Sequence, residues 1–487
     1  MRRMTIHPTG IQLRPDSARV LVRPFIPSEP ARIVNIVGRA LAMSESEAEE
    51  ELAAVRAEFG HRHQELTAIW RRAFERVQAH VFTGRPLSET RRLLIGALFC
   101  GEYALESAAL FNPSIVPSPD QSGMQDGELR FVLSLRATGE GHISSIEFRG
   151  GVIHADHSIT LETPSGFVTA PVQNPNPTYR KSVFLHKLME MGFENDWSTA
   201  LLQSLQNDFT LSELETAMRQ SAGGLGPLSR EEQRTSECVR WLAQSNYEVH
   251  FDESVHVSER IIFPVSSNES NGMEDARFTR FIEDDGTATY YATYTAYNGR
   301  AILPQLLETS DFLSFRARTL NGRAVQNKGM ALFPRRIHGR YAMISRQDDE
   351  NLFLMYSDNP HFWSEPRLLR RPRYSWEAVK IGNCGSPLET DAGWLVITHG
   401  VGPMRKYSIG AILLDLEDPS KVLAETAEPL IRPDGSEREG YVPNVVYTCG
   451  ALLHRGRLIL PYGVSDTIST IVTIEIDELL ATLKWLE

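Results

Sequence analysis

Near the start of the chain, apolar residues recur with the period of an α-helix. From Ser44 to about residue 82 apolar residues recur at helical spacing, and Ser44 with Glu47 has the pattern of a capping box. A Gly-Arg-Pro turn at 84–86 predicts the end of this stretch, and Ser88 predicts the start of another apolar helix. We therefore expect residues 1–107 to form a mainly α-helical N-terminal extension with a short irregular lead-in.

Alternating positions follow the extension. Apolar and polar residues alternate over 129–135 and again over 143–148, which predicts strands. Helical signals return at about 175–248, where Thr210-x-x-Glu and Ser229-x-x-Glu both have the capping-box pattern. We interpret this segment as a helical insertion between strands.

Short strand candidates then follow one another with Gly, Pro, Asn and Asp turns, without an amphipathic helix between them. A Ser-Asp pair followed by aromatic residues occurs at Ser310 and again at Ser357, which is close to the length of one propeller blade. The pattern favours a mainly β fold, with residues 108–487 forming a five-bladed β-propeller interrupted by the insertion. From the pattern alone, a β-sandwich is the alternative fold. The strand candidates are 288–297, 330–333, 341–345, 352–357, 394–398, 409–414, 458–462 and 468–476.

Charge narrows the class of partner. The 487 residues carry a net charge of −12 and no long basic run, which argues against nucleic-acid and membrane-surface partners and favours a small molecule. No stretch of about 18 apolar residues occurs, and the N-terminus lacks the apolar core of a signal peptide. The four cysteines are far apart, without a CxxC pair. We expect a cytoplasmic protein.

The densest cluster of candidate catalytic residues lies at 268–280, where carboxylates and arginines stand at a loop-to-strand boundary. Asp275 can act as a general acid if its surroundings raise its pKa, and Arg277 can orient it. A solvated Asp–Arg pair in a turn is the alternative.

Several cationic or hydroxyl-bearing side chains stand beside apolar strand candidates in this acidic chain. If they converge, they suit a free phosphate ion, whereas separate surface salt bridges are the alternative. They are Lys328, Arg346, Lys380, His399 and Tyr407.

Other kinds of site have little support. The chain has no GxGxxG, no P-loop, no GxSxG and no HExxH pattern. His61 and His63 are two residues apart on a helix, so they face different directions. His154 and His157 flank Ala155-Asp156 in what we interpret as a polar turn, without a fourth ligand in view. We expect no metal site.

In order along residues 108–480, several motifs resemble glycoside hydrolase family 130, which comprises β-mannoside phosphorylases and mannosidases built as five-bladed propellers. The helical insertion and the first ~105 residues are outside the resemblance, which is specific through the order of the motifs. These motifs are Phe111-Asn112-Pro113-Ser114, Glu274-Asp275-Ala276-Arg277, Leu332-Phe333-Pro334, Lys380-Ile381-Gly382-Asn383, Pro387-Leu388-Glu389-Thr390 with Gly393-Trp394-Leu395, Leu413-Leu414-Asp415-Leu416 with Asp418-Pro419-Ser420, Val442-Pro443-Asn444-Val445-Val446 and Tyr462-Gly463-Val464-Ser465-Asp466-Thr467.

The resemblance implies an inverting glycoside phosphorylase that cleaves β-1,2-mannooligosaccharides or a β-1,4-mannosyl-glucose with inorganic phosphate to give α-mannose 1-phosphate. Asp275 would be the proton donor, acting through the 3-hydroxyl of the bound mannose. The resemblance assigns phosphate to Lys328, Arg346, His399 and Tyr407, and mannose to Asn112, Arg136, Lys380 and Asp466. No metal or organic cofactor is implied, because phosphate is itself the nucleophile and needs cations to hold it.

Two rival functions are kept. One is an inverting β-mannosidase of the same family that uses water, with Glu389 or another carboxylate as base. The other is a non-catalytic sugar-binding propeller. The chain departs from the family pattern at Ala276, where Pro is usual, and at Gly329, where Asn or Asp is frequent. The extension and the insertion either close the site over one end of the substrate or form a homo-oligomer interface.

Overall fold

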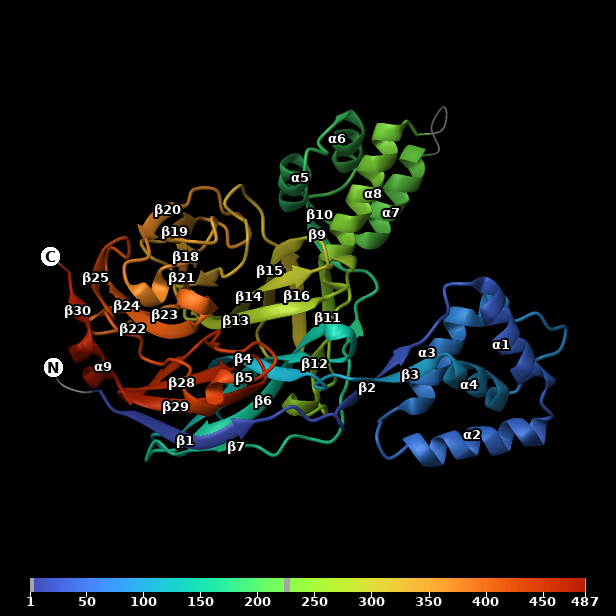
Figure 1. Cartoon of the computed structure of the whole chain (residues 1–487). Helices are drawn as coiled ribbons and strands as arrows, with labels where there is room; N and C mark the ends of the chain where they lie inside the picture. Colours follow the sequence, from blue (N-terminus) through green and yellow to red (C-terminus); the bar gives the residue numbers. More distant parts are fainter. Residues whose placement is uncertain (1–3, 223–227, 487) are drawn as a thin grey trace.

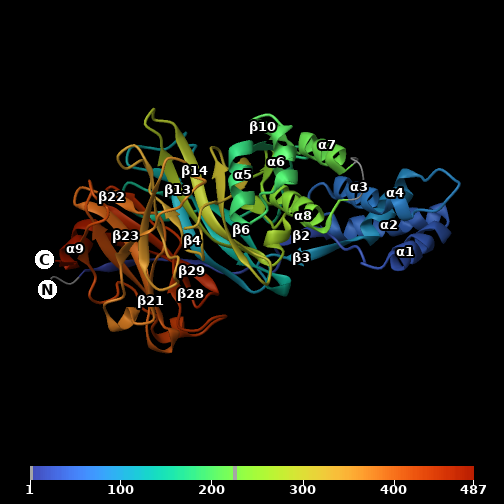
Figure 2. The same cartoon turned by 90° about the horizontal axis from the view of Figure 1, so that it is seen from above.

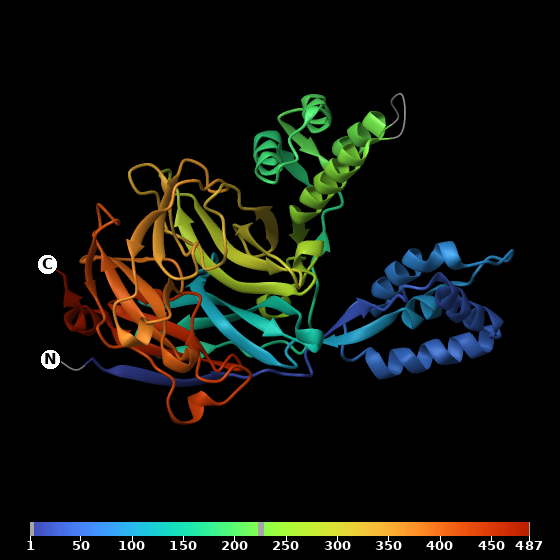
Figure 3. The same cartoon turned by 45° about the horizontal axis from the view of Figure 1, so that its top comes forward.

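The computed structural model describes residues 4–222 and 228–486. A body of β-sheets makes up most of this part of the chain, and two groups of helices project from it (Figure 1). The fold is mainly β with helices, as the sequence predicts. The first group of helices lies at one end of the molecule, and both chain termini lie at the other end (Figures 1, 2 and 3).

The largest sheet contains two meanders of antiparallel strands, which we call strand groups 1 and 2. A single parallel pair, Gly272 with Ser144, joins them into one sheet of 11 strands. Group 1 comprises β4 (Ala109–Pro117), β5 (Leu129–Thr138), β6 (Ser144–Ile153) and β7 (Ile159–Leu161), with β12 (Ile261–Ile262) paired to β6. Group 2 comprises β13 (Gly272–Ile282), β14 (Ala288–Tyr297), β15 (Ile302–Thr309) and β16 (Ser314–Thr319), followed at its edge by β11 (Tyr247–His250) and β8 (Val172–Gln173).

Three further sheets complete the β body. Strand group 3 comprises β17 (Ala331–Leu332), β18 (Tyr341–Ser345), β19 (Leu352–Ser357) and β20 (Arg367–Arg370). Strand group 4 comprises β21 (Lys380–Asn383), β22 (Leu388–Thr390), β23 (Gly393–Val401), β24 (Tyr407–Leu414), β25 (Val422–Glu425) and β30 (Lys484–Trp485). Strand group 5 comprises β26 (Val446–Tyr447), β27 (Leu452–His454), β28 (Arg457–Val464), β29 (Ile468–Glu475) and β1 (Ile6–Leu13).

The place of β1 corrects the expected irregular lead-in. Residues 6–13 pair antiparallel with β29, so the first strand of the chain lies in the last sheet. The register shifts between Pro8 and Gln12, and an edge strand tolerates such a proline because its N–H side needs no partner. Pro8 and Gly10 interrupt the alternating pattern, so the sequence does not predict a strand here. The backbone hydrogen bonds of β1 are made with the edge of β29.

Five apolar clusters make up most of the core of the β body, and each lies between two strand groups. Groups 1 and 2 meet at Phe148 and Phe278, and groups 2 and 3 meet at Phe281 and Met343. The remaining clusters join groups 3 and 4 through Ile344 and Val396, groups 4 and 5 through Ile409 and Leu460, and groups 5 and 1 through Ile471 and Leu133. Apolar packing therefore runs through the five groups in chain order and returns from the last to the first, although no sheet closes on itself through hydrogen bonds in the described residues.

The first group of helices interrupts two paired strands, β2 (Val20–Pro24) and β3 (Cys100–Ala104). Ser44 and Glu47 make the predicted capping box, and the Ser88 side chain accepts the N–H of Arg91 at the next helix start. The single helical stretch expected from Ser44 to residue 82 is divided after Phe59, and a helix that precedes it was not predicted. The helices are α1 (Pro30–Ala42), α2 (Glu45–Phe59), α3 (Leu66–Val77) and α4 (Glu89–Leu98).

The second group of helices fills the expected insertion and packs around its own core, which includes Phe184 and Leu242. Ser229 and Glu232 form the predicted capping box, and Thr210 and Glu213 exchange the two reciprocal hydrogen bonds of one. The elements are β9 (Thr178–Arg180), α5 (Lys181–Glu190), α6 (Asp196–Gln203), β10 (Asp208–Thr210), α7 (Leu211–Ala222) and α8 (Arg230–Ser245), and a last helix, α9 (Ile476–Thr482), follows β29.

A buried ion cluster anchors the segment before β2 to strand group 1. Arg19 is 2% exposed, and its guanidinium lies 2.7 Å from Glu106 and 3.0 Å from Glu147. Arg149 on β6 pairs with the same two carboxylates. Each buried carboxylate is shared by two arginines, which offsets part of the desolvation cost, although burial and the charge of Glu147 still raise the pKa of Glu106 to about 8.

Candidate active site

The candidate active site is built around a bulge in β13. The pairing of β13 with β14 shifts between Glu274 and Arg277, and Asp275 within the bulge has φ 54°. A positive φ is rare for residues other than glycine, and a bulge turns a side chain out of the regular alternation of a strand. This backbone directs the nearly buried Asp275 carboxylate toward strand group 1.

Two side chains of strand group 1 bind that carboxylate. Asn112 donates Nδ2–H to Asp275 Oδ1 at 2.7 Å, and Arg136 Nη1 donates to the same oxygen at 3.3 Å. Asn112 also lies in a bulge, with φ 49°, so two bulges on neighbouring groups face each other. Arg136 Nη2 donates to Glu274 at 2.7 Å, and the Lys328 ammonium lies 3.6 Å from the other oxygen of Glu274. The structure thus brings Asn112, Arg136 and Lys328 around the Glu274–Asp275 pair.

Arg277 holds the Asp275 backbone in place. Its Nη1 donates to the main-chain carbonyl of Asp275 at 2.8 Å, while Nη2 donates to the Tyr447 hydroxyl at 2.7 Å and Nε to the Cys384 carbonyl at 3.1 Å. Arg277 is 2% exposed, and its three partners lie in, or directly after, strands of groups 2, 4 and 5. The solvated Asp–Arg turn left open from the sequence is therefore wrong.

The charge state of Asp275 is set by the cations around it. Burial raises the pKa of its carboxyl, but the charges of Arg136, Arg277 and Lys328, with the hydrogen bond from Asn112, outweigh burial and hold the pKa well below its usual range. The condition set for a general acid, a raised pKa, is therefore not met by these surroundings. Asp275 here is a carboxylate, and it must gain a proton before it can donate one.

Asp466 has the opposite character. It lies in the turn between β28 and β29 with φ 49°. Burial, followed by the negative charges of Asp275 and Glu274, raises the pKa of Asp466 to about 7 against the attraction of Arg136. The pKa of Asp275 is thus lowered and that of the neighbouring Asp466 is raised. Neighbouring carboxyl groups with pKa values shifted in opposite directions are common at catalytic sites, where one acts as the acid.

A second set of side chains lies on strand groups 3 and 4. Arg346, directly after β18, donates from Nη1 to Nε2 of His399 on β23 at 2.9 Å. The His399 ring stacks on that of Tyr407, with ring centres 5.9 Å apart and an angle of 13° between the planes. Arg346 is 5% exposed, and its Nε has no hydrogen-bond partner among the described residues. An unpaired guanidinium N–H in a buried position is suited to an oxyanion.

His399 is not a cation in this arrangement. Burial lowers its pKa well below the usual range, and the nearby charges of Arg346, Arg277 and Lys380 lower it further. Because Nε2 accepts the hydrogen bond from Arg346, the neutral ring carries its proton on Nδ1, which faces the Cys384 sulfur at 3.9 Å. Of the expected cationic array, His399 supplies a neutral ring.

Lys380 lies with this second set. Its ammonium is 3.1 Å from both carboxylate oxygens of Asp349, which also pairs with Arg346 Nη2 at 3.2 Å. The structure therefore places Lys380 beside Arg346 and His399, whereas the sequence grouped it with Asn112 and Arg136. The charges of Arg277 and Asp275 act on His399 as well, so the two sets adjoin across Arg277.

Ala276 and Gly329, the two departures from the family pattern, both fit the local backbone. Ala276 is buried within the bulge, and Gly329 has φ 90°, a left-handed conformation that glycine adopts without strain. A Cβ at residue 329 would lie 3.9 Å from Arg346 Nε. The glycine next to Lys328 therefore fits the backbone conformation and keeps the surroundings of Arg346 open.

Four site residues were missed by sequence reasoning as members of the site: Glu274, Asp349, Cys384 and Tyr447. Glu274 and Tyr447 lie in or directly after motifs that had been recognised, which was an available signal. Asp349 lies in an exposed bend and Cys384 directly after β21, and sequence spacing does not show that they meet Arg346 and Arg277.

The other candidate sites are explained by local contacts. His154 bonds Glu128 and Thr160, and His63 pairs with Glu102. Across residues 4–222 and 228–486, His, Cys, Asp and Glu side chains form no group of three or more that could hold a metal ion. In the same residues we find no helix with the length and apolar character needed to span a membrane. All four cysteines are free.

Comparison with known proteins gives consistent matches. The sequence model of the family described as "Glyco_hydro_130: beta-1,4-mannooligosaccharide phosphorylase" matches residues 241–485. The chain is 35% identical over 228 residues to a 1,2-β-oligomannan phosphorylase of Thermoanaerobacter sp. (strain X514), covering 45% of this chain and 75% of that protein. It is 33% identical over 243 residues to a β-1,2-mannobiose phosphorylase of the same strain, covering 47% and 73%.

Among solved structures, the β-1,2-mannobiose phosphorylase from Listeria innocua in complex with β-1,2-mannobiose aligns with a TM-score of 0.46 at 21% identity, over 77% of this chain and 92% of that one. Asn112 and Arg136 precede the residues that the family model matches. Their contacts with Asp275 are therefore an observation independent of that match.

Proposed function

Because the chain belongs to glycoside hydrolase family 130, a family of mannoside phosphorylases, we propose that it is an inverting phosphorylase that cleaves β-mannosides with inorganic phosphate and releases α-mannose 1-phosphate. The proposed substrates are β-1,2-mannooligosaccharides, with β-1,4-mannosyl-glucose as the second candidate, since relatives are named for both types of linkage.

The observation that carries this proposal is the buried Arg346, which donates to neutral His399 and keeps Nε unpaired within the described residues. A planar guanidinium with a free donor binds a phosphate oxyanion in a fixed direction. Lys328, which acts on both Asp275 and Asp466 through its charge, supplies a second cation between the two sets. Tyr407 adds a hydroxyl beside the His399 ring.

The proposed proton route follows from the charge states. A hydrogen phosphate dianion between Lys328 and Arg346 offsets their positive charge, which raises the pKa of Asp275 and lets it take a proton. Asp275 donates this proton to the leaving oxygen, through the sugar 3-hydroxyl, while a phosphate oxygen forms the bond to the anomeric carbon. Loss of the phosphate proton to Asp275 restores the carboxyl group, so the proton balance closes without a metal or organic cofactor.

Mannose binding is assigned to Asn112, Arg136 and Asp466, which surround Asp275, and Lys380 is retained as a sugar contact on the opposite side, beside Asp349. The raised pKa of Asp466, about 7, lets it exchange hydrogen bonds with a sugar hydroxyl as donor or acceptor near neutral pH.

The hydrolytic rival has less support. Glu389, its candidate base, is 43% exposed in its side chain and pairs with Arg335 through two contacts of 2.8 Å. Glu389 is also absent from the main charges that act on Asp275 in the described structure. A base must face the water that it activates, across the sugar ring from the acid.

We also propose that the β body is a five-bladed propeller. The five strand groups, the five clusters between them and the pairing of β1 with β29 support this arrangement. In it the single Gly272–Ser144 pair is a contact between two blades, and the site lies where the inner strands of all five meet.

Proton and phosphorus NMR during cleavage of β-1,2-mannobiose tests the proposed reaction. The first sugar product should be the α-anomer of mannose 1-phosphate, formed at the same rate as free mannose. A β-phosphate would contradict inversion, and free mannose alone would establish hydrolysis.

A further inference from the structure

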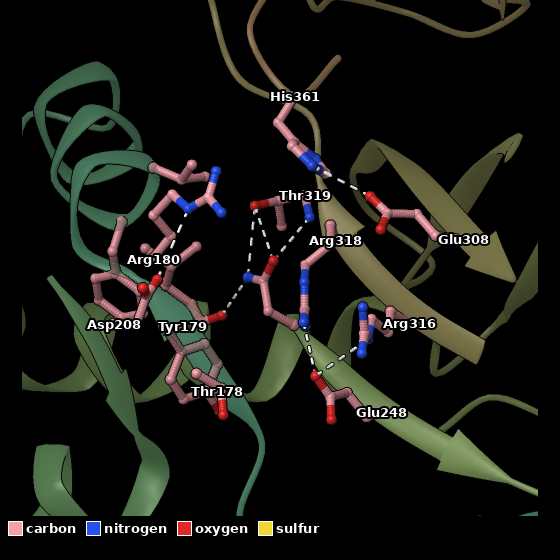
Figure 4. A pocket seen from close by; sticks show the side chains of 14 residues that line it. Thr178, Tyr179, Arg180, Asp208, Glu248, Glu308, Arg316, Arg318, Thr319 and His361 are labelled. Atoms are coloured by element: carbon pink, nitrogen blue, oxygen red, sulfur yellow. Dashed lines mark hydrogen bonds and ion pairs between the residues drawn. The ribbon is translucent and has the colours of Figure 1, made fainter. Parts of the chain in front are cut away.

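A second cavity lies away from Asp275, between the helical insertion and the outer strands of strand group 2. Its volume is about 360 Å³, which is within the range of small-ligand sites. Figure 4 shows it from close by, with β9 on one side and β16 on the other. The insertion contributes Arg180 and Asp208, whereas Arg316 and Arg318 come from β16.

Three guanidinium groups line this cavity, and most of their N–H groups form no hydrogen bond within the described residues. Among the described residues they donate one hydrogen bond, from Arg318 Nη2 to Glu248 at 2.8 Å. Arg316 approaches Glu248, and Arg180 approaches Asp208, only to 3.7 Å. Nη1 of Arg318 is buried without a hydrogen-bond partner in the same residues. Each guanidinium has five N–H donors, so most of this donor capacity is available to a ligand.

The far side of the cavity suits hydroxyl groups. His361 Nε2 lies 3.1 Å from Glu308 Oε1, and His361 Nδ1 is buried without a partner in the described residues. Burial, together with the charges of Arg318 and Arg180, keeps the His361 ring uncharged at neutral pH, so Nδ1 or Nε2 offers a lone pair. A neutral imidazole beside a carboxyl group can both accept from and donate to sugar hydroxyls.

The arrangement favours an anionic sugar over a neutral oligosaccharide. The two aromatic side chains of the lining, Tyr179 and Phe184, are 5% and 4% exposed and pack into the core of the insertion. They therefore offer no open ring face on which a neutral sugar could stack. The arginine N–H donors that form no hydrogen bond in the described residues instead match a phosphate group, which arginine binds through parallel hydrogen bonds.

We propose that this cavity is a second binding site, for a phosphorylated sugar, with the phosphate on Arg180, Arg316 and Arg318 and the sugar hydroxyls on Glu308 and His361. Because the phosphate contacts come from both the insertion and the sheet, the ligand would join the two.

Calorimetric titration of the full chain with mannose 1-phosphate tests the proposal. The double variant Arg180→Gln/Arg316→Gln removes two exposed guanidiniums, and Arg219→Gln, on α7 with a side chain 70% exposed, is the matched control. We expect the double variant to weaken one binding event by about tenfold or more, and the control to leave it unchanged. Inorganic phosphate and mannose, titrated separately, should each bind more weakly than the sugar phosphate.

The failures of the two proposals can be distinguished with Arg346→Lys, which alters the candidate active site alone. If sugar phosphate binding responds to Arg346→Lys and not to the double variant, the cavity is not a site. If it responds to the double variant and not to Arg346→Lys, the second site stands even when phosphorolysis fails. Equal affinity for inorganic phosphate would reduce the site to a simple anion site and overturn the sugar assignment.

Discussion

Arg346 donates a hydrogen bond from Nη1 to Nε2 of His399 at 2.9 Å, and this contact sets the tautomer of the imidazole and the direction of the guanidinium. The imidazole stays neutral because burial and three nearby cations disfavour its protonation. The guanidinium, in turn, is held with its Nε unpaired in the described structure. A neutral histidine orients the arginine without adding a charge of its own, and the guanidinium, which also pairs with Asp349, keeps Nε for an incoming phosphate.

Replacement of Asp275 tests the acid assigned here. Asp275→Asn keeps the shape of the side chain and a hydrogen-bonding oxygen but cannot hand over a proton. We expect kcat to fall by about 10²–10⁴-fold, while substrate affinity changes little. Asp358→Asn, at a side chain that is 87% exposed, is the control. Initial rates and inhibitor binding measure the two effects, and retention of more than a tenth of kcat would remove Asp275 from this role.

Replacement of Gly382 tests whether the observed positions of Arg346 and His399 matter for phosphate binding. A Cβ at this residue would lie 2.3 Å from His399 Cε1 and 3.0 Å from Arg346 Nη1, closer than van der Waals contact allows. Gly382→Ala should therefore displace both side chains and raise the KM for phosphate by about tenfold or more, with a smaller change in the KM for the mannoside. Gly38→Ala, in α1 with open space around it, is the control. Equal KM values for wild type and Gly382→Ala would show that the pair does not bind phosphate.

Asp466 makes the stability of the protein depend on pH. Its pKa in the folded chain, about 7, is above that of an unfolded aspartate, so the folded state binds the extra proton between roughly pH 4 and 7. The cost of the buried charge is absent below pH 4 and is fully present above pH 7. Asp466→Asn should thus raise the Tm at pH 8 by about 2 °C or more and have little effect at pH 4.

Thermal unfolding at both pH values measures this difference. The same variant should bind mannosides more weakly at pH 8, because the amide replaces an ionised carboxylate, which is the stronger acceptor for a sugar hydroxyl. A Tm increase of the same size at both pH values would show that charge burial is not its cause.

The buried ion cluster predicts a large loss of stability. Arg19→Met would leave Glu106 and Glu147 sharing one arginine in a buried position, at a cost of about 3–5 kcal/mol in the free energy of unfolding. Arg14→Met, at an exposed position before the same segment, is the control. Denaturant unfolding followed by tryptophan fluorescence measures the change, and a loss below 1 kcal/mol would mean that the carboxylates lose their charge at little cost.

The sequence predicts the strands well, because most are short apolar runs between strong turns. The strands 288–297, 341–345 and 352–357 have the expected bounds as β14, β18 and β19. Strand β1 escaped prediction, since Pro8 and Gly10 break its pattern and its partner β29 lies at the other end of the chain. Sheet membership is a long-range property that local period does not contain.

For the candidate site, too, part could be predicted from the sequence and part could not. Residue types and motif order were sufficient to select Asp275, Asn112, Arg136 and Arg346, which the structure places in two adjoining sets. The charge states could not be read in the same way, because they depend on how many cations surround a buried carboxyl. Burial, with the charges of Arg346 and Arg277, keeps the His399 ring neutral. The charges of Arg136, Arg277 and Lys328, which come from different parts of the chain, hold the pKa of Asp275 low.

The most direct measurement of the central claim is the initial rate of β-1,2-mannobiose cleavage as a function of phosphate concentration, for wild type, Arg346→Lys and the exposed control Arg340→Lys. We predict no cleavage without phosphate, saturation in wild type and the control, and a KM for phosphate at least about tenfold higher in Arg346→Lys, because lysine cannot reproduce the planar donor set. Cleavage at an equal rate with and without phosphate would contradict the account and identify a hydrolase.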